Sequence, residues 1–186
     1  MLNLVVAACG ASGAPYTRRL LQALRAAEAR DVAVSVVMSP TAREVWSHEC
    51  GGDVRDLGFP LYDHRDFHAP FASGSSDTQA MVVIPCSMGT LARIAHGISQ
   101  DLIGRAADVM LKERRKLVLV TRETPLSLIH IENMRAVTLA GGVVMPASPS
   151  FYGKKETVED LLDSVVGRVL DHLGVPVDRG PRWGEP

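Results

Sequence analysis

Leu2-Asn3-Leu4-Val5-Val6-Ala7-Ala8-Cys9-Gly10-Ala11-Ser12-Gly13-Ala14-Pro15 joins a short apolar run to a glycine-rich turn. The apolar run predicts a buried strand, and the glycines end it. Leu20, Leu21 and Leu24 then recur at helical spacing within residues 15–29, which predicts a helix. The proline suits the first turn of that helix, where its missing N–H costs nothing. The chain therefore opens with a strand, a glycine turn and a helix.

Short apolar segments continue to alternate with helical ones along the chain. We predict further strands at 32–38, 81–85, 117–120 and 143–145, and helices at 41–48, 91–96, 102–114, 129–139 and 157–173. This alternation predicts an α/β fold with a doubly wound, Rossmann-like or flavodoxin-like parallel sheet and helices on both faces. Residues 51–76 are rich in Gly, Pro, Asp, His and Ser, and their length indicates an irregular functional loop.

Length and composition limit the kind of protein. The 186 residues fit a single domain, which we expect to cover 1–174, followed by a Pro- and Gly-rich extension at 175–186. A formal net charge of -1 gives no global basic field of the kind that non-specific nucleic-acid binding needs. No apolar run approaches the roughly 20 residues that cross a bilayer, so we expect no membrane association. Hydrophobic residues make up 46%, which leaves apolar surface for contacts between copies.

The cysteines and the first residues indicate where the protein works. Cys9, Cys50 and Cys86 are an odd number without paired spacing, which argues against a disulfide framework and against a structural zinc site. Residues 1–8 lack the positively charged segment of a signal peptide and are typical of a strand. We therefore expect a cytoplasmic protein.

Three turns rich in hydroxyl groups and glycine lie where ligands bind in parallel sheets. Residues 10–13 link the first strand to its helix, residues 87–90 follow the strand at 81–85, and residues 73–76 form a third such turn. Several turns at one crevice build a nest of N–H and O–H donors for a phosphate and the polar edge of a heterocycle. The first turn lacks the full G-x-G-x-x-G pattern and alone is equally compatible with a plain tight turn. A mononucleotide phosphate fits it better than a dinucleotide.

Charged side chains follow the predicted strand at 117–120. Arg122 and Glu123 stand at its carboxyl end, where open parallel sheets bind their ligands, so we expect phosphate clamping and proton transfer there. A wider set of cationic and phenolic side chains is larger than one mononucleotide phosphate needs, which indicates a second phosphate: Lys112, Arg105, Arg122, Arg168 and Tyr152.

Taken together, these motifs resemble those of the UbiX-type flavin prenyltransferases. The resemblance covers nearly the whole chain and rests on ordered matches at residues 10–13, 72–76, 85–90, 105–115, 122–123, 130–134, 151–152 and 181–185. One departure is Cys9, which precedes the glycine turn where Thr is common in the family. The resemblance implies that residues 1–174 form an FMN-binding flavoprotein domain.

The resemblance also implies an activity. Such enzymes join the dimethylallyl group of dimethylallyl phosphate to N5 and C6 of reduced FMN, without a metal, and the prenylated FMN serves UbiD-type decarboxylases. Flavin N5 displaces the phosphate, C6 closes a fourth ring, and Glu123 and the departing phosphate move protons. A homododecamer with sites shared between copies is implied as well, with the extension at 175–186 as a contact between copies. The preference for monophosphate or pyrophosphate stays open.

Site residues are carried over position by position. FMN would be held by Gly10, Ala11, Ser12, Ser39, Ser87, Met88, Gly89, Thr90 and Arg122. Dimethylallyl phosphate would be bound by Tyr152, Arg168, Lys112, Arg105 and Trp183. Catalytic roles would fall to Glu123, Ser12, Lys112 and Glu49.

Two other functions remain as alternatives. FMN-dependent cysteine decarboxylases share the fold and the flavin site, but they need a His near the third strand and a Pro-Ala-Met-Asn segment after the fourth. Here the corresponding stretches read Ala72-Ser73-Gly74-Ser75 and Arg122-Glu123-Thr124-Pro125. The other alternative is a non-catalytic FMN-binding protein, in which Glu123 and Lys112 would have no role.

Overall fold

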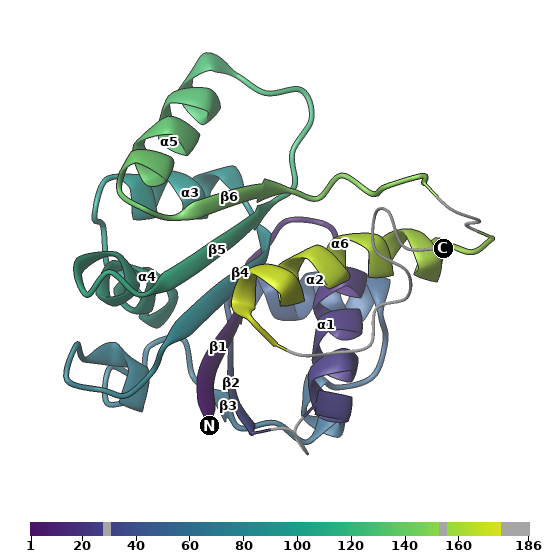
Figure 1. Cartoon of the computed structure of the whole chain (residues 1–186), viewed down its shortest axis with the longest axis horizontal. Helices are drawn as coiled ribbons and strands as arrows, with labels where there is room; N and C mark the ends of the chain where they lie inside the picture. The colour runs from purple at the N-terminus through teal and green to yellow at the C-terminus, as the bar shows by residue number, and fades with distance from the viewer. Residues whose placement is uncertain (28–30, 153–155, 176–186) are drawn as a thin grey trace.

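The computed structural model describes residues 1–27, 31–152 and 156–175. Strands and helices alternate through these ranges (Figure 1). They are β1 (Leu2–Ala8), α1 (Ala14–Ala27), β2 (Val32–Met38), α2 (Pro40–Glu49), β3 (Leu61–Tyr62), β4 (Ala80–Cys86), α3 (Met88–Ala95), α4 (Leu102–Lys112), β5 (Lys116–Thr121), α5 (Leu128–Leu139), β6 (Val143–Pro146) and α6 (Val158–Leu173). Two short 3-10 helices, Val54–Leu57 and Pro70–Ala72, flank β3 along the chain.

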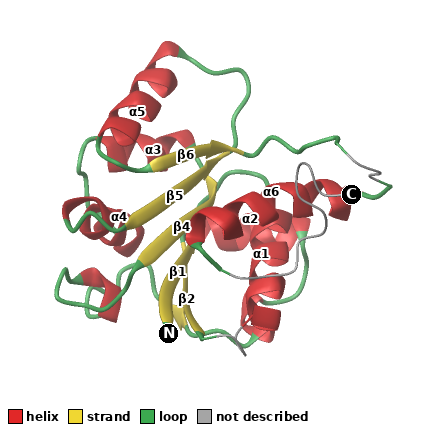
Figure 2. Ribbon diagram, in the orientation of Figure 1, coloured by secondary structure: helices red, strands yellow, loops and turns green. Residues whose placement is uncertain are grey.

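The six strands form one sheet in the order β3-β2-β1-β4-β5-β6, with every neighbouring pair parallel in the described part of the chain. Helices α1, α2 and α6 cover one face, and α3, α4 and α5 cover the other (Figure 2). The predicted α/β fold with a doubly wound parallel sheet is confirmed, and its strand order is the Rossmann-like one. Because the strand order reverses between β1 and β4, ligands are expected beyond the carboxyl ends of these two strands.

Strand β1 lies in the middle of the sheet and is buried on both faces. Leu4 and Val6 pack under α1 and α6, whereas Val5 and Ala7 pack on the opposite face. A strand that is covered on both sides is apolar throughout instead of alternating, which is the pattern of this segment. Its two faces therefore anchor both helix layers.

Helix α1 begins directly after the glycine turn. Gly13 has a φ of 124°, where a side chain would be strained, and there the chain turns from β1 into the helix. Leu20 and Leu21 are 0% exposed. Arg19 donates two hydrogen bonds to the carboxylate of Asp163 in α6, at 2.7 and 2.5 Å. This ion pair links the first helix to the last on the same face of the sheet.

The segment between α2 and β4 is more ordered than its composition predicts. Within residues 51–76 lie two 3-10 helices and the edge strand β3. We did not predict β3, because two residues, Leu61 and Tyr62, are too short for a hydrophobic pattern. They pair with β2 opposite Val36 and Val37, so the sheet has six strands instead of the five predicted.

Helix α6 closes the face that also carries α1 and α2. A capping box between Thr157 and Asp160 begins it, and Gly174 in the left-handed conformation ends it after 16 residues. Its buried side includes Val165 and Val169. Across the described ranges, no helix combines the length and the apolar character that crossing a bilayer requires.

We predict that Leu20→Ala lowers the free energy of unfolding by about 2–5 kcal/mol, because it leaves a cavity between α1 and the sheet. The matched control is Gln22→Ala, an exposed site on the same helix, which should change that free energy by less than about 0.5 kcal/mol. Urea denaturation followed by circular dichroism, with every variant at the same protein concentration, measures both. Equal effects would contradict the packing described for α1.

Candidate functional site

A cavity of about 240 Å³ opens at the carboxyl ends of β1 and β4, where the strand order reverses. Its lining residues come from the loops after β1, β2 and β4 and from the starts of α3 and α4: Cys9, Gly10, Ser39, Thr41, Ser87, Thr90, Arg93, Asp101 and Ile103. Four residues predicted to hold the cofactor thus lie together here. Two of the three predicted donor turns therefore meet in one place.

The third predicted turn, residues 73–76, is not part of this cavity. Arg115 donates to the carbonyl of Gly74 at 2.7 Å and to Ser76 Oγ at 3.4 Å, which holds the turn beside the end of α4. Within one copy of the chain, the nest of donors is therefore built from two turns. The expectation that all three share one crevice is wrong for a single copy, because the loop before β4 runs to the opposite end of the sheet.

The start of α3 supplies donors for an anion. Ser87 caps the helix by accepting from the N–H of Thr90 at 3.3 Å, and its hydroxyl donates to Thr90 Oγ1 at 3.1 Å. Met88 and Gly89 occupy the first turn, whose N–H groups have no acceptor within a helix. Free N–H groups and the positive helix end favour a phosphate at this position.

Gly10 is required by a close approach between two loops. A Cβ at this residue would lie 2.7 Å from the Cβ of Thr41, so any side chain would push away the first turn of α2, which follows the loop after β2. Ser39 begins that loop and caps α2, accepting from the N–H of Ala42 at 3.0 Å. Its hydroxyl also lies 3.1 Å from Thr41 Oγ1. The glycine therefore brings these two hydroxyl groups to the cavity.

The carboxylate of Glu49 holds the N-terminus of α1. Its Oε2 accepts from the N–H groups of Gly13 and Ala14, both at 2.8 Å. Burial raises the pKa of Glu49, but hydrogen bonds from Ser12, Gly13 and Ala14 and the nearby charge of Arg122 together lower it below the ordinary value. The anion at this helix start is therefore a protein carboxylate, and the phosphate donors predicted at residues 10–13 are partly used.

Arg122 and Glu123 follow β5 at the same edge of the sheet. Arg122 Nε donates to the carbonyl of Ser12 at 2.9 Å, which joins the end of β5 to the glycine turn. Glu123 is exposed, and its Oε1 accepts from the N–H of Thr124 at 3.0 Å. Ser12, Glu49 and Arg122 thus form one group, and Glu123 is the next residue after Arg122. The fourth residue expected to be catalytic, Lys112, is not part of this group.

Lys112 and Arg105 lie elsewhere. Lys112 ends α4 before β5 begins, so the length of β5, about 17 Å for its six residues, separates it from the loop that holds Arg122. Its ammonium forms an ion pair with Glu113. Arg105 donates to the carbonyl of Ala72 at 2.9 Å and to Asp108 at 2.7 Å. The two cations form a second group, with the loop before β4.

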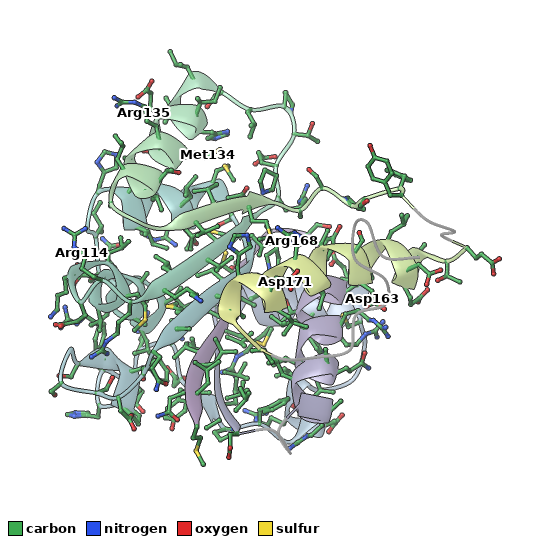
Figure 3. All side chains as sticks on the ribbon, in the orientation of Figure 1. Arg114, Met134, Arg135, Asp163, Arg168 and Asp171 are labelled. Atoms are coloured by element: carbon green, nitrogen blue, oxygen red, sulfur yellow. The ribbon has the colours of Figure 1, made fainter. Side chains whose placement is uncertain are left out.

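Tyr152 and Arg168 belong to a third group. Arg168 lines a cavity of about 420 Å³ together with Ser150, and its guanidinium donates to Asp171 at 3.0 Å (Figure 3). Tyr152 follows two residues later and is 79% exposed. Helix α6 lies on the opposite face of the sheet from α4, so this group is remote from Lys112. Trp183 lies outside the described residues.

Several lining residues were missed at the sequence level. Arg93 lies one turn after Thr90 on α3 and donates to its Oγ1 at 3.0 Å. Asp101 caps α4 by accepting from Gly104 at 2.8 Å, and a capping residue before a helical pattern is the signal that would have located it. Cys9 also lines the cavity, although the sequence identifies it only as a departure from the family pattern.

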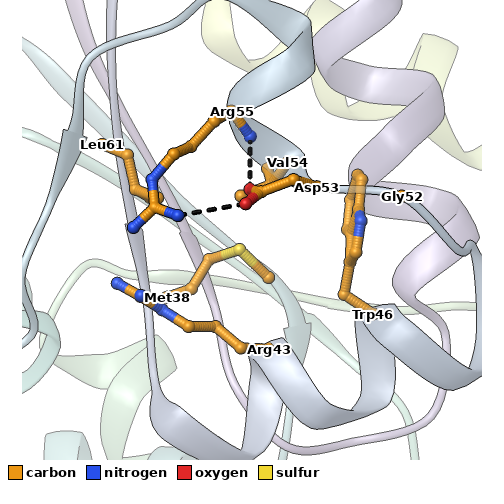
Figure 4. A pocket seen from close by; sticks show the side chains of 8 residues that line it. All are labelled: Met38, Arg43, Trp46, Gly52, Asp53, Val54, Arg55 and Leu61. Carbon is orange, nitrogen blue, oxygen red and sulfur yellow. Dashed lines mark hydrogen bonds and ion pairs between the residues drawn. The ribbon is translucent and has the colours of Figure 1, made fainter.

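A further hollow of about 140 Å³ lies between β2, α2 and the following 3-10 helix (Figure 4). Asp53 pairs with Arg55 in it, and Arg43 lies beside them. Trp46 Nε1 is buried without a hydrogen-bond partner among the described residues. None of the predicted site residues lines this hollow.

We predict that Glu49→Gln destabilises the fold by about 0.5–1 kcal/mol at neutral pH, because a helix N-terminus loses its carboxylate. Since the folded-state pKa of Glu49 is lowered, its contribution is complete above the ordinary value of 4.5 and disappears as the pH falls through the folded-state value. Urea denaturation of both proteins from pH 7 to pH 3 measures the difference. A difference that stays constant down to pH 3 would contradict this role.

Known proteins share this architecture along its whole length. A family model described as flavoprotein matches residues 1–170. The flavin prenyltransferase UbiX of Methanothermobacter thermautotrophicus is 45% identical over 183 residues, which cover 97% of this chain and 94% of the relative. The dodecameric FMN-dependent UbiX-like decarboxylase from Escherichia coli O157:H7 has a TM-score of 0.92 and 46% identity, covering 98% of this chain and 99% of that one.

A second solved structure, AnUbiX in complex with FMN and dimethylallyl pyrophosphate, has a TM-score of 0.91 and 46% identity and covers 98% of this chain and 97% of that one. Matches of this extent include every element that builds the cavity, from β1 to α4. This chain therefore belongs to the flavoprotein family and, within it, to the UbiX-type flavin prenyltransferases.

Proposed function

We propose that this protein joins the dimethylallyl group of dimethylallyl phosphate to N5 and C6 of reduced FMN without a metal. The observation that carries the proposal is the meeting of Ser12, Glu49, Arg122 and Glu123 at the sheet edge where the strand order reverses. A cation, two carboxylates and a hydroxyl lie there together. The complex of AnUbiX with FMN and dimethylallyl pyrophosphate supports both ligand classes.

The donors of the cavity fit FMN. The hydroxyls of Ser39, Ser87 and Thr90 line it, and the first turn of α3 faces it with N–H groups. Arg93 adds a cation. Polar groups at a strand-order reversal are the usual setting for a flavin or nucleotide phosphate. Bound reduced FMN would supply the nucleophilic N5 and C6 atoms, and these residues would hold and orient it.

Proton transfer would fall to the acidic group beside Arg122. Glu123 is exposed at the end of β5, so its carboxylate is accessible to a bound ligand, and it would accept the proton that leaves flavin C6. Ser12 and Glu49 are hydrogen-bonded to each other, which orients the Ser12 hydroxyl beside the glycine turn. Arg122, tied to the Ser12 carbonyl, would stabilise negative charge on a phosphate.

The remaining residues would reach the site from other copies of the chain. Within one copy, Lys112 and Arg105 lie toward the opposite end of β5 from Glu123, and Tyr152 and Arg168 form a separate group. Assembly as a dodecamer, the state of the Escherichia coli relative, would bring complementary groups together. Exposed apolar side chains supply surface for such contacts, on and near α5 at Leu126, Leu128, Ile129, Ile131 and Leu139, and between β6 and α6 at Phe151.

Further parts of the proposal concern partners and location. The extension at 175–186 would contact another copy, and Trp183 within it would border the prenyl group. The product, prenylated FMN, would pass to a UbiD-type decarboxylase. The three cysteines are free, which supports a cytoplasmic location, because thiols stay reduced there.

Anaerobic incubation with reduced FMN and dimethylallyl phosphate, or in parallel the pyrophosphate, should yield an extracted flavin heavier by one dimethylallyl unit in mass spectrometry. Glu123→Gln should slow its formation by at least about 100-fold, because it removes the proton acceptor. Glu44→Gln, an exposed carboxylate on α2, is the matched control and should retain the activity. Unmodified FMN with both donors would instead identify a non-catalytic FMN-binding protein.

Sharing of the site between copies predicts rescue in mixed oligomers. Glu123→Gln and Lys112→Ala, each inactive alone, should recover about a quarter of the wild-type rate when co-expressed, since random assembly leaves that share of sites with both residues intact. Co-expressed Glu123→Gln and Arg122→Ala provide the control, because both defects then lie in the same group. No rescue of the first pair would show that one copy carries a complete site.

A further inference from the structure

Cys9 and Cys86 stand opposite each other where β1 and β4 end. The N–H of Cys9 donates to the carbonyl of Pro85, at 3.4 Å, which is the bond that a parallel strand makes to the residue before its opposite partner. Both side chains belong to the apolar cluster on the same face of the sheet. Neighbouring strands lie about 4.8 Å apart, within the Cα separation of about 4.4–6.8 Å that a disulfide spans.

The two thiols contact each other and the start of α3. Cys9 Sγ accepts from the N–H of Ser87 at 3.0 Å, and as a thiol it donates to the carbonyl of Pro85 at 3.1 Å. A hydrogen bond from Cys86, joined by bonds from Thr90 and Ser87, outweighs burial and lowers the pKa of Cys9 to about 6. The same contact with Cys9 raises the pKa of Cys86. One sulfur is thus suited to be a thiolate and the other a thiol.

Small reagents can reach this pair through the cavity. Cys9 lines the cavity and is 4% exposed, whereas Cys86 is 0% exposed behind it. Charged neighbours at the cavity are Arg93 from α3 and Asp101 before α4. Cys50 is the third cysteine, at the end of α2, and burial raises its pKa, so it is the less reactive thiol. Reactivity of Cys9 at this place is independent of the groups assigned to catalysis.

We propose that Cys9 and Cys86 form a reversible, peroxide-sensitive disulfide at the floor of the cavity. The Cys9 thiolate attacks one oxygen of hydrogen peroxide, giving a sulfenic acid and hydroxide. The Cys86 thiol then attacks the Cys9 sulfur, the S–S bond forms, and the sulfenic oxygen leaves with the thiol proton as water. In sum, two thiols and one peroxide give one disulfide and two waters. Hydrogen peroxide from any source would serve, and reduced FMN in the proposed pocket would also generate it on meeting oxygen.

Oxidation would also change the start of α3. Cys9 Sγ accepts the N–H of Ser87 in the reduced protein, and the disulfide weakens that bond by moving the sulfur toward Cys86 and removing its negative charge. Ser87 caps α3, whose first turn faces the cavity. The oxidised protein should therefore bind FMN about fivefold more weakly, the effect of losing one ordinary hydrogen bond. This consequence rests on the proposed FMN pocket, whereas the disulfide does not.

The test uses the full chain with Cys50→Ser, which leaves the pair as its only cysteines. Native protein is treated with equimolar hydrogen peroxide, its remaining thiols are alkylated, and the intact mass and non-reduced peptides are measured. The expected product is lighter by two hydrogens, escapes alkylation, links the peptides of Cys9 and Cys86, and reverts with dithiothreitol. FMN binding is then titrated by flavin fluorescence before and after oxidation.

Variants separate the outcomes. Cys9→Thr, which keeps a hydroxyl to accept from Ser87, should lose both the peroxide-dependent mass change and the change in FMN binding. A sulfenic or sulfinic acid on Cys9 without a link to Cys86, or a link between two copies, would overturn the proposal. Failure of prenyl transfer with an intact disulfide response would count against the proposed function alone.

Discussion

The hydrogen bonds that Glu49 accepts from the start of α1 are the interaction on which the site depends. Its carboxylate accepts hydrogen bonds from the N–H groups of Gly13 and Ala14, which fixes the glycine turn against the end of α2. Arg122 then binds the same turn from the other side through the carbonyl of Ser12. The loop after β1, the end of α2 and the loop after β5 are thereby held together. Glu49 therefore has two roles: its charge stabilises the start of α1, and the residue itself is part of the site.

Much of the fold follows from the pattern of apolar residues. Strands buried on both faces give continuous runs of apolar residues, as in β1. Helix α6 is recognisable from its amphipathic repeat and from Thr157 at its N-cap. Strand β3 is not predictable from the sequence pattern, because it is two residues long and forms only by pairing with β2. Its existence is decided by a distant partner, which no local pattern contains.

The site was partly predictable for the same reason. Turns at strand ends identify Ser87 and Arg122, since topology alone brings carboxyl ends together, whereas Ser39 is assigned only by the family resemblance. Lys112 stands at the amino end of β5, whereas Glu123 stands at its carboxyl end. The rule that ligands bind at one edge of the sheet therefore does not predict that the two residues share a site. Arg93 and Cys9 were missed, because their positions depend on a helix turn and a strand pairing and not on any motif.

The central place of β1 has a consequence for synthesis on the ribosome. The first strand made is flanked by β2, which follows soon, and by β4, which begins only at Ala80. At about 5–20 residues per second, the backbone N–H and C=O groups along one edge of β1 stay unpaired for several seconds before β4 is made. An unpaired strand edge of this kind recruits other chains. Nascent chains that stall before Ala80 therefore carry an open edge of β1 that can pair with strands of other chains.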